Sequence, residues 1–249
     1  MHKTILITGA TAGIGLATAE VFAEQGHRLI LTGRRTERLE ALAARLSVDC
    51  YSLAFDIRDL EAVKAAVASL PAQWREIDIL VNNAGLAVGL SPIQSGVVDD
   101  WERMIDTNVK GLLYITREIA PMMIERGLGG HIINVASIAG KEVYPNGNVY
   151  CASKHAADAL SKAMRIDLLP HKIKVTNVAP GLVETEFSVV RFKGDQARAD
   201  QVYQGIEPLT GKDIADVIAY VASTPPHVTI NDIVVMPTAQ AASTVIFRE

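Results

Sequence analysis

The chain has 249 residues, of which 49% are hydrophobic and 21% are charged. This composition is typical of a globular protein with apolar material for one large core or two small ones. The net charge of −4 and the pI of about 5.9 provide no overall positive field, which argues against nucleic acid or an anionic membrane surface as the partner.

The cysteine content and the N-terminal sequence both indicate in which cellular compartment the protein is expected. The chain has two cysteines, Cys50 and Cys151, which is typical of a reducing compartment without a disulfide framework. Met1 leads almost directly into the apolar segment Thr4–Thr8, so the features of a signal peptide are missing, and no apolar run is long enough to span a bilayer. We therefore expect a cytoplasmic protein. The six histidines are scattered without other ligands at metal spacing, and we predict no metal site.

Short apolar segments alternate with helical patterns along the chain. The predicted strands are Thr4–Thr8, Arg28–Thr32, Cys50–Phe55, Ile79–Asn82, His131–Ala136, Lys174–Ala179 and Ile233–Met236. The predicted helices are Gly15–Gln25, Glu37–Leu46, Leu60–Leu70, Asp99–Glu125, Tyr150–Leu168 and Asp213–Ser223. Most of the strands are continuously apolar, as expected for parallel strands covered on both faces. The pattern predicts an α/β fold with a doubly wound sheet in one domain over residues 1–249, although the length alone would allow two domains.

Two loops follow predicted strands and have the length of binding loops. They are Leu86–Val98 and Gly181–Ala199. Loops of this length inside a compact domain are often lids or ligand-binding segments. Because ligands of open α/β sheets bind at the carboxyl ends of the strands, we expect both loops to border the site, with residues 181–199 as a substrate loop.

A glycine-rich turn, Thr8–Gly15, joins the first predicted strand to the first predicted helix. Glycines at Gly9, Gly13 and Gly15 permit a tight turn and a close approach of backbone N–H groups to a phosphate, and the helix N-terminus adds a favourable dipole. A turn that binds nothing is the alternative. The position between a strand and a helix favours a dinucleotide site.

Two arginines, Arg34 and Arg35, follow the second predicted strand. Proteins that bind NAD often carry an acidic residue near this point for the ribose 2′-hydroxyl, whereas arginine suits the 2′-phosphate of NADP. The alternative is a solvated basic pair at the start of the next helix. Their position favours NADP as the cofactor.

Polar residues also end the third and fourth predicted strands. Asp56 is a candidate acceptor for the adenine amino group, or else a cap of the following helix, for which Asp59 is equally suited. The segment Asn82–Gly85 is a candidate for contact with a ribose, or else a simple Asn/Gly turn.

Tyr150 and Lys154 are separated by four residues, and Ser137 precedes the tyrosine by thirteen. A pair at this spacing lies on one face of a helix. A lysine charge there can lower the tyrosine pKa, so that the hydroxyl can exchange a proton with a carbonyl or alcohol oxygen. Ser137 can hold the same oxygen by a hydrogen bond. The pair alone is common in helices, so its meaning depends on the rest of the chain.

Taken together, these segments resemble the short-chain dehydrogenase/reductase family. The resemblance covers nearly the whole chain and rests on the T-G-x-x-x-G-I-G turn, Asp56, the N-N-A-G segment, Asn108, Ser137, Tyr150, Lys154 and Pro180-Gly181 with Thr185. It implies a Rossmann fold with a seven-stranded parallel sheet and helices on both faces, frequent homotetramers, and reversible NAD(P)-dependent carbonyl reduction.

Within that family the chain is most similar to the NADP-dependent 3-hydroxy acid dehydrogenases. The segments that carry this narrower resemblance are Thr32–Leu39, Asn82–Gly89, Asp100–Asn108, Gly147–Tyr150 and Pro180–Asp195. It implies activity on small 3-hydroxy acids such as L-serine and L-allo-threonine, and reduction of malonic semialdehyde to 3-hydroxypropionate.

The resemblance also implies roles for individual residues. Tyr150 is expected to act as general acid or base, Lys154 to hold the nicotinamide ribose, Ser137 to orient the substrate oxygen, and Asn108 to support a water or a backbone kink. The residues expected to contact NADP are Gly9, Thr11, Gly13, Ile14, Gly15, Arg34, Arg35, Asp56, Ile57, Asn82, Ala84, Tyr150, Lys154, Pro180, Gly181, Val183 and Thr185.

A 3-hydroxy acid carries a carboxylate, and the substrate loop contains two cations that can pair with it, Arg191 and Lys193. Arginine is the better bidentate partner, although a solvated charge is the alternative for either residue. Two other functions stay open: a reductase of 3-oxoacyl thioesters or other ketones within the family, and an NADP-binding regulatory subunit without catalysis.

Overall fold

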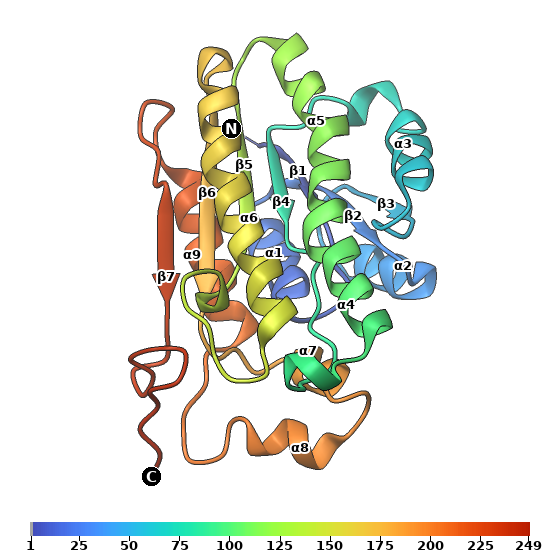
Figure 1. The fold of residues 1–249 in the computed structure, drawn as a ribbon. Helices are drawn as coiled ribbons and strands as arrows, with labels where there is room; N and C mark the ends of the chain where they lie inside the picture. Colours follow the sequence, from blue (N-terminus) through green and yellow to red (C-terminus); the bar gives the residue numbers. More distant parts are fainter. Residues whose placement is uncertain (1) are drawn as a thin grey trace.

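The computed structural model describes residues 2–249 and is built on one parallel sheet (Figure 1). Its strands are β1 (Thr4–Ile7), β2 (Arg28–Gly33), β3 (Cys50–Ala54), β4 (Ile79–Asn82), β5 (Gly130–Val135), β6 (Ile173–Pro180) and β7 (Asp232–Val235). They are ordered β3-β2-β1-β4-β5-β6-β7, and all neighbouring pairs are parallel. The predicted doubly wound, seven-stranded α/β fold is confirmed.

Helices cover both faces of the sheet. One face carries α1 (Gly13–Glu24), α2 (Thr36–Arg45) and α9 (Gly211–Ser223). The other carries α3 (Leu60–Ala68), α5 (Leu112–Arg126) and α6 (Asn148–Asp167), and Figure 1 shows α5 and α6 in front of the sheet. Each face of the sheet packs a hydrophobic core, and β1 contributes to both: Ile5 and Ile7 belong to one core and Leu6 to the other. Such two-sided burial explains why the strands are continuously apolar.

The long helix predicted over Asp99–Glu125 contains an irregular turn. α4 (Val98–Ile105) continues through a π-helical turn (Asp106–Gly111) into α5. Turns of this kind occur frequently at functional sites, and this one contains Asn108. α5 also includes Pro121 and ends at Gly127, whose φ of 70° is the left-handed conformation that glycine adopts most easily.

The predicted substrate loop contains two short helices, α7 (Glu186–Arg191) and α8 (Gln196–Gln201). Each begins with a side chain that accepts a backbone N–H, Thr185 for α7 and Asp195 for α8. The remaining short helices are 3-10 turns at Ala72–Trp74, Ile93–Ser95, Ile138–Gly140 and Leu169–His171. Other predicted boundaries differ from the observed ones by at most two residues, which is the usual uncertainty of helix and strand ends.

The carboxyl ends of all the strands meet at one edge, and the chain reverses its direction of winding between β1 and β4. This switch point opens a crevice where the segments after β1 and β4 diverge. Over residues 2–249, no helix combines the length and the hydropathy that crossing a membrane requires.

Candidate active site

A cavity of about 440 Å³ extends along the carboxyl edge of the sheet. It begins at the turn after β1 and the end of β2, and it reaches Ser137, Tyr150 and the substrate loop. Its lining runs from Arg34 and Arg35 to Ser137 and Tyr150 and includes residues of α7, which suits an extended ligand. Among the predicted cofactor contacts, those that line it are Gly9, Thr11, Gly13, Ile14, Arg34, Arg35, Asp56, Ile57, Ala84, Tyr150, Lys154, Pro180, Gly181, Val183 and Thr185.

The glycine-rich turn brings bare backbone to the cavity wall. Gly9 and Gly13 have φ values of 67° and 54°. A Cβ on Gly9 would lie 3.0 Å from the Ala84 Cα, and one on Gly13 would lie 3.2 Å from the Thr185 Cβ. A Cβ on Gly15 would meet the Gly9 carbonyl oxygen at 2.3 Å, so that glycine packs the turn against α1 and does not line the cavity. The turn therefore has the geometry of a phosphate-binding loop.

Three arginines lie near one another past the end of β2: Arg34, Arg35 and Arg38, here called the arginine cluster. Arg35 Nη2 donates to Thr11 Oγ1 at 3.0 Å. Glu186 of α7 reaches the same cluster, with distances of 3.1 Å to Arg38 and 3.7 Å to Arg35. The cluster is half-exposed and opens on the cavity through Arg34 and Arg35. It is positioned to hold a phosphate group at the end of β2.

Asp56 borders the cavity but its carboxylate is already engaged. Arg58 donates to it from its backbone nitrogen and from its guanidinium, at 2.7–3.1 Å. The hydrogen bond from the Arg58 side chain holds the Asp56 pKa below its ordinary value. The cap of α3 is Asp59, not Asp56. Three donor groups of Arg58 make four hydrogen bonds that already use the acceptor positions of the carboxylate, so contact with adenine requires Arg58 to shift.

The two asparagines after β4 point in different directions. Asn82 is 4% exposed, and its side-chain nitrogen donates to Thr116 and Asn134 inside the core, so its side chain does not line the cavity. Asn83 does line it and donates to the carbonyl oxygens of Thr8 and Gly9, at 2.9 and 3.2 Å. Asn83 therefore fixes the glycine-rich turn, a role that the sequence analysis assigned to neither residue.

Ser137, Tyr150 and Lys154 converge on the other end of the cavity. Ser137 follows β5 and accepts a hydrogen bond from the Ala139 backbone at 3.1 Å. Tyr150 and Lys154 lie on one face of α6, and the Lys154 ammonium is 6.0 Å from the centre of the tyrosine ring. Lys154 Nζ donates to the Val135 carbonyl at 3.0 Å. The three side chains are buried and line one space.

Burial has the largest effect on the pKa values of Tyr150 and Lys154. It raises the pKa of Tyr150 well above its ordinary value, while the Ser137 side chain and the Arg191 charge act in the opposite direction. It lowers the pKa of Lys154 to about 8. In the protein alone, desolvation raises the tyrosine pKa, and Lys154 is not among the groups that lower it, contrary to our expectation.

Asn108 does not line the cavity but supports its wall from the π-helical turn. Its side-chain oxygen accepts from the Leu86 backbone at 2.9 Å, and its nitrogen donates to the Leu86 carbonyl at 2.8 Å and to Ser153 at 3.0 Å. It thus ties the loop after β4 to α6, one residue before Lys154.

Arg191 reaches into the cavity from the end of α7. Its guanidinium carbon is 5.2 Å from the Tyr144 ring centre and 5.5 Å from that of Tyr150. Arg191 Nε and Nη2 and the Tyr144 hydroxyl are all buried, and none of these atoms has a hydrogen-bond partner within residues 2–249. Lys193, the other candidate, is paired with Asp100 at 2.8 Å. Of the two candidates, Arg191 is the one that forms no ion pair within residues 2–249.

Four residues near the cavity were not predicted individually: Arg38, Tyr144, Glu186 and Phe187. Asn83 lies in the predicted segment Asn82–Gly85, but its contact with the glycine-rich turn was not predicted. Phe187 lies 5.6 Å, centre to centre, from the Tyr150 ring. Arg38 lies in the first turn of α2, close in the sequence to Arg34 and Arg35. The contacts of Tyr144, Glu186 and Phe187 depend on how the substrate loop folds over the sheet, which no local pattern reports.

Comparison with known proteins agrees with this geometry. A model described as short chain dehydrogenase matches residues 3–196. The chain therefore belongs to the short-chain dehydrogenase family. It is 50% identical over 238 residues to the NADP-dependent 3-hydroxy acid dehydrogenase YdfG of Salmonella typhimurium, covering 95% of this chain and 96% of the relative.

Two further relatives share the full length of the chain. Serine 3-dehydrogenase of Rhizobium radiobacter is 47% identical over 250 residues, covering 100% of both chains. A solved structure, described as the closed form of serine dehydrogenase complexed with NADP+, has a TM-score of 0.94 at 46% identity and 99% coverage of both chains. A 3-ketoacyl-(acyl-carrier-protein) reductase from Brucella melitensis complexed with NADH is more distant, with a TM-score of 0.84 at 29% identity, covering 94% of this chain and 96% of the other.

Proposed function

We propose that the protein is an NADP-dependent oxidoreductase that interconverts small 3-hydroxy acids and the corresponding 3-oxo acids. Family membership supports the reaction type, and the names of the full-length relatives support the cofactor and the substrate class. The observation that carries the substrate class is the Arg191 guanidinium beside Tyr150, whose buried Nε and Nη2 have no hydrogen-bond partner within residues 2–249.

The cavity fits NADP along its whole length. The glycine-rich turn offers backbone N–H groups at a helix N-terminus for the pyrophosphate, and Arg34 and Arg35 are available for the 2′-phosphate. The nicotinamide end is expected to lie between Lys154 and the segment Pro180–Thr185, which lines the cavity beside Tyr150. When bound, NADPH supplies the hydride for the carbonyl carbon.

The residues at this end are suited to hold the carbonyl and to move its proton. In the reducing direction the Tyr150 hydroxyl donates its proton to the carbonyl oxygen and becomes a tyrosinate, and in the oxidising direction the tyrosinate accepts the proton of the alcohol. In the protein alone the raised pKa of Tyr150 keeps the hydroxyl protonated at neutral pH. Ser137 donates a second hydrogen bond to the same oxygen. Lys154 holds the ribose hydroxyls, and Asn108 keeps the wall in place through Leu86 and Ser153.

Arg191 is proposed as the anchor of the substrate carboxylate. Two buried nitrogens of a guanidinium without partners are unfavourable unless a ligand completes them, and a carboxylate matches the fork geometry of the group. The Tyr144 hydroxyl, also unpartnered within residues 2–249, can donate a further hydrogen bond to the same ligand. A neutral substrate would leave these donors unsatisfied, which gives selectivity for acids.

The finer proposals concern substrate, assembly and location. Malonic semialdehyde is the proposed physiological carbonyl compound, with L-serine and L-allo-threonine as oxidisable substrates. We propose that the whole chain works as one domain, with residues 181–199 as the substrate loop, in a cytoplasmic homotetramer. Size measurement by light scattering tests the assembly separately from the activity.

The test is the rate of NADPH oxidation by the purified protein with malonic semialdehyde, compared with an acetoacetyl thioester. Rapid oxidation with the semialdehyde and little with the thioester is expected. The opposite preference would leave the cofactor and the catalytic residues in place and move the function to acyl-chain reduction. If NADPH binds but neither substrate reacts, the protein is a binding subunit and the proposed activity is wrong.

A further inference from the structure

Glu186 connects the substrate loop to the arginine cluster at the other end of the cavity. It is the first residue of α7, directly after the N-cap Thr185, and its carboxylate lies 3.1 Å from Arg38 and 3.7 Å from Arg35. The pairing joins segments 148 residues apart in the sequence. A protein carboxylate therefore occupies the cluster that the proposed function assigns to the 2′-phosphate.

The local charges are unequal. The arginine cluster contributes three positive charges and Glu186 one negative charge, while Arg34 forms no ion pair within residues 2–249. A phosphate that binds at Arg34 and Arg35 adds further negative charge within a few ångströms of the carboxylate. The two anions repel each other, although both lie at the surface, where solvent and salt weaken the effect.

The same ion pairs also help to keep the substrate loop closed. α7 spans the cavity, with Glu186 at the arginine cluster and Arg191 over Tyr150 at its other end. Thr185 lies against the glycine-rich turn, so closure brings Glu186 to the cluster whichever nucleotide is bound. Loss of the ion pairs should weaken closure with either nucleotide, and this loss is separate from the repulsion that only the 2′-phosphate of NADPH experiences.

We propose that Glu186 sets the strength of the preference for NADPH, by placing a carboxylate in the arginine cluster that recognises the 2′-phosphate. The proposal rests on the proposed NADP site. In this proposal Glu186 reduces the preference for NADPH over NADH. The same residue also helps to hold α7 in place. Surface ion pairs of this kind contribute little to stability, which fits a tuning role better than a structural one.

The experiment measures dissociation constants of NADPH and NADH, by nucleotide fluorescence, for the wild-type protein, Glu186→Gln and Glu184→Gln. Glu184 is an exposed neighbour on the same loop for which no ion pair is formed within residues 2–249, so it controls for net charge. We expect the ratio of the NADH to the NADPH constant to rise about three- to tenfold in Glu186→Gln, and to change little in Glu184→Gln. The ratio cancels any loss of loop closure common to both nucleotides.

The outcomes separate the two proposals. If wild-type protein prefers NADPH and the ratio in Glu186→Gln is unchanged, falls, or matches that of Glu184→Gln, the proposal for Glu186 is wrong and the NADP site stands. If wild-type protein shows no preference for NADPH, the assignment of the arginine cluster is wrong as well, and both proposals fail.

Discussion

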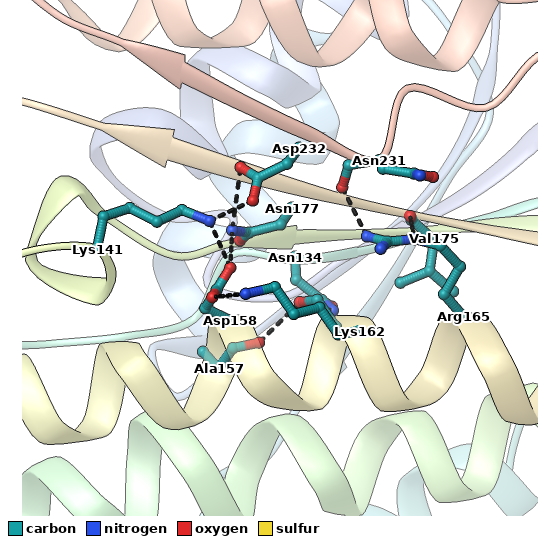
Figure 2. A network of polar contacts seen from close by, with 11 residues as sticks. Asn134, Lys141, Ala157, Asp158, Lys162, Arg165, Val175, Asn177, Asn231 and Asp232 are labelled. Carbon is teal, nitrogen blue, oxygen red and sulfur yellow. Dashed lines mark hydrogen bonds and ion pairs between the residues drawn. The ribbon is translucent and has the colours of Figure 1, made fainter.

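Lys141 and Lys154 are both shielded from solvent, but Lys141 is paired with carboxylates and Lys154 is not. Lys141 donates to Asp158 at 2.6 Å and also pairs with Asp232, and Figure 2 shows both carboxylates turned toward its ammonium. Lys154 lies in the cavity, with a carbonyl oxygen, that of Val135, at 3.0 Å. Burial alone would lower the pKa of Lys141, but the two carboxylates raise it, whereas burial lowers that of Lys154 to about 8.

The same contrast extends to the neighbours of each lysine. Asp158 accepts from Lys141, Lys162 and Asn177, so a polar cluster links α6 to β6 and β7 (Figure 2). In the cavity, Arg191 leaves two buried nitrogens unpaired within residues 2–249. Unpaired buried atoms also occur outside the cavity within residues 2–249, and Asn177 Oδ1 in the polar cluster is one of them. Those of Arg191 differ because they are donors of a cation that lines the cavity, where a ligand can pair with them. We therefore interpret the first cluster as a structural joint and the second as a candidate ligand site.

The strongest test of this contrast is Tyr150→Phe. Removal of the hydroxyl is expected to reduce turnover roughly 10²-fold or more, because the general acid–base is lost. NADPH affinity should remain close to that of the wild type, since the phenyl ring keeps its packing against Phe187. Steady-state rates with malonic semialdehyde and nucleotide fluorescence provide the two readouts. Near-normal turnover in this variant would contradict the assigned role.

The second test is Arg191→Ala, with Lys193→Ala as its matched control on the same loop. We expect kcat/KM for an acidic substrate to fall about 10- to 100-fold relative to a neutral ketone, as for loss of a charge-assisted contact. Lys193 is already paired with Asp100, so its removal should affect both substrates equally. If kcat/KM fell equally for acidic and neutral substrates in Arg191→Ala, Arg191 would not bind the substrate carboxylate.

The sequence predicted features that depend on short local patterns better than features that depend on contacts between distant segments. Continuous apolar segments and helical periodicity lie within single elements, and they predicted the sheet and its helices. The glycine-rich turn, Arg34-Arg35 and the spacing of Ser137, Tyr150 and Lys154 are likewise short patterns, and the structure brings them to one cavity. The direction of Asn82 and the π-helical turn at Asn108 depend on packing against distant segments, and no such pattern predicts them.

The choice between Arg191 and Lys193 shows this difference most clearly. Both are cations on the same loop and two residues apart, so the sequence left them as alternatives. The distinction comes from Asp100, a residue of α4 that is 4% exposed and pairs with Lys193 alone. Whether a cation has an ion-pair partner depends on tertiary contacts, which the sequence does not show. Here the cation without such a partner is the one that we assign to the substrate.

The third test addresses the structural joint. Asp158→Ala is expected to lower the free energy of unfolding by about 2 kcal/mol, because it leaves Lys141, Lys162 and Asn177 with fewer acceptors. Urea unfolding measures the loss. Lys162→Ala is the control: its side chain is 59% exposed, and its pair with Asp158 is a surface pair that should contribute less than about 0.5 kcal/mol. Equal losses in the two variants would show that the joint is not held by Asp158.

The smallest and most discriminating test is Lys154→Met, measured without nucleotide. The folded-state pKa of Lys154, about 8, lies below the ordinary lysine value of 10.5, so the folded protein disfavours the charged form. Between these two pH values the unfolded chain binds more protons, and the stability contributed by this group rises with pH. At pH 7.5 the variant should therefore be more stable than the wild type, by about 1 kcal/mol after loss of the Val135 hydrogen bond.

Measurement of the same variant at pH 9.5 completes the argument. The wild-type protein should regain stability as Lys154 deprotonates, so the advantage of the variant should shrink. The comparison ends below pH 10, because the raised pKa of Tyr150 makes the unfolded chain lose that proton first and reverses the trend at higher pH. A variant that is less stable at pH 7.5, with a difference that does not change with pH, would show that Lys154 is a satisfied structural cation like Lys141. A more stable but inactive variant would mean that the fold tolerates an unfavourable buried charge because the reaction needs it.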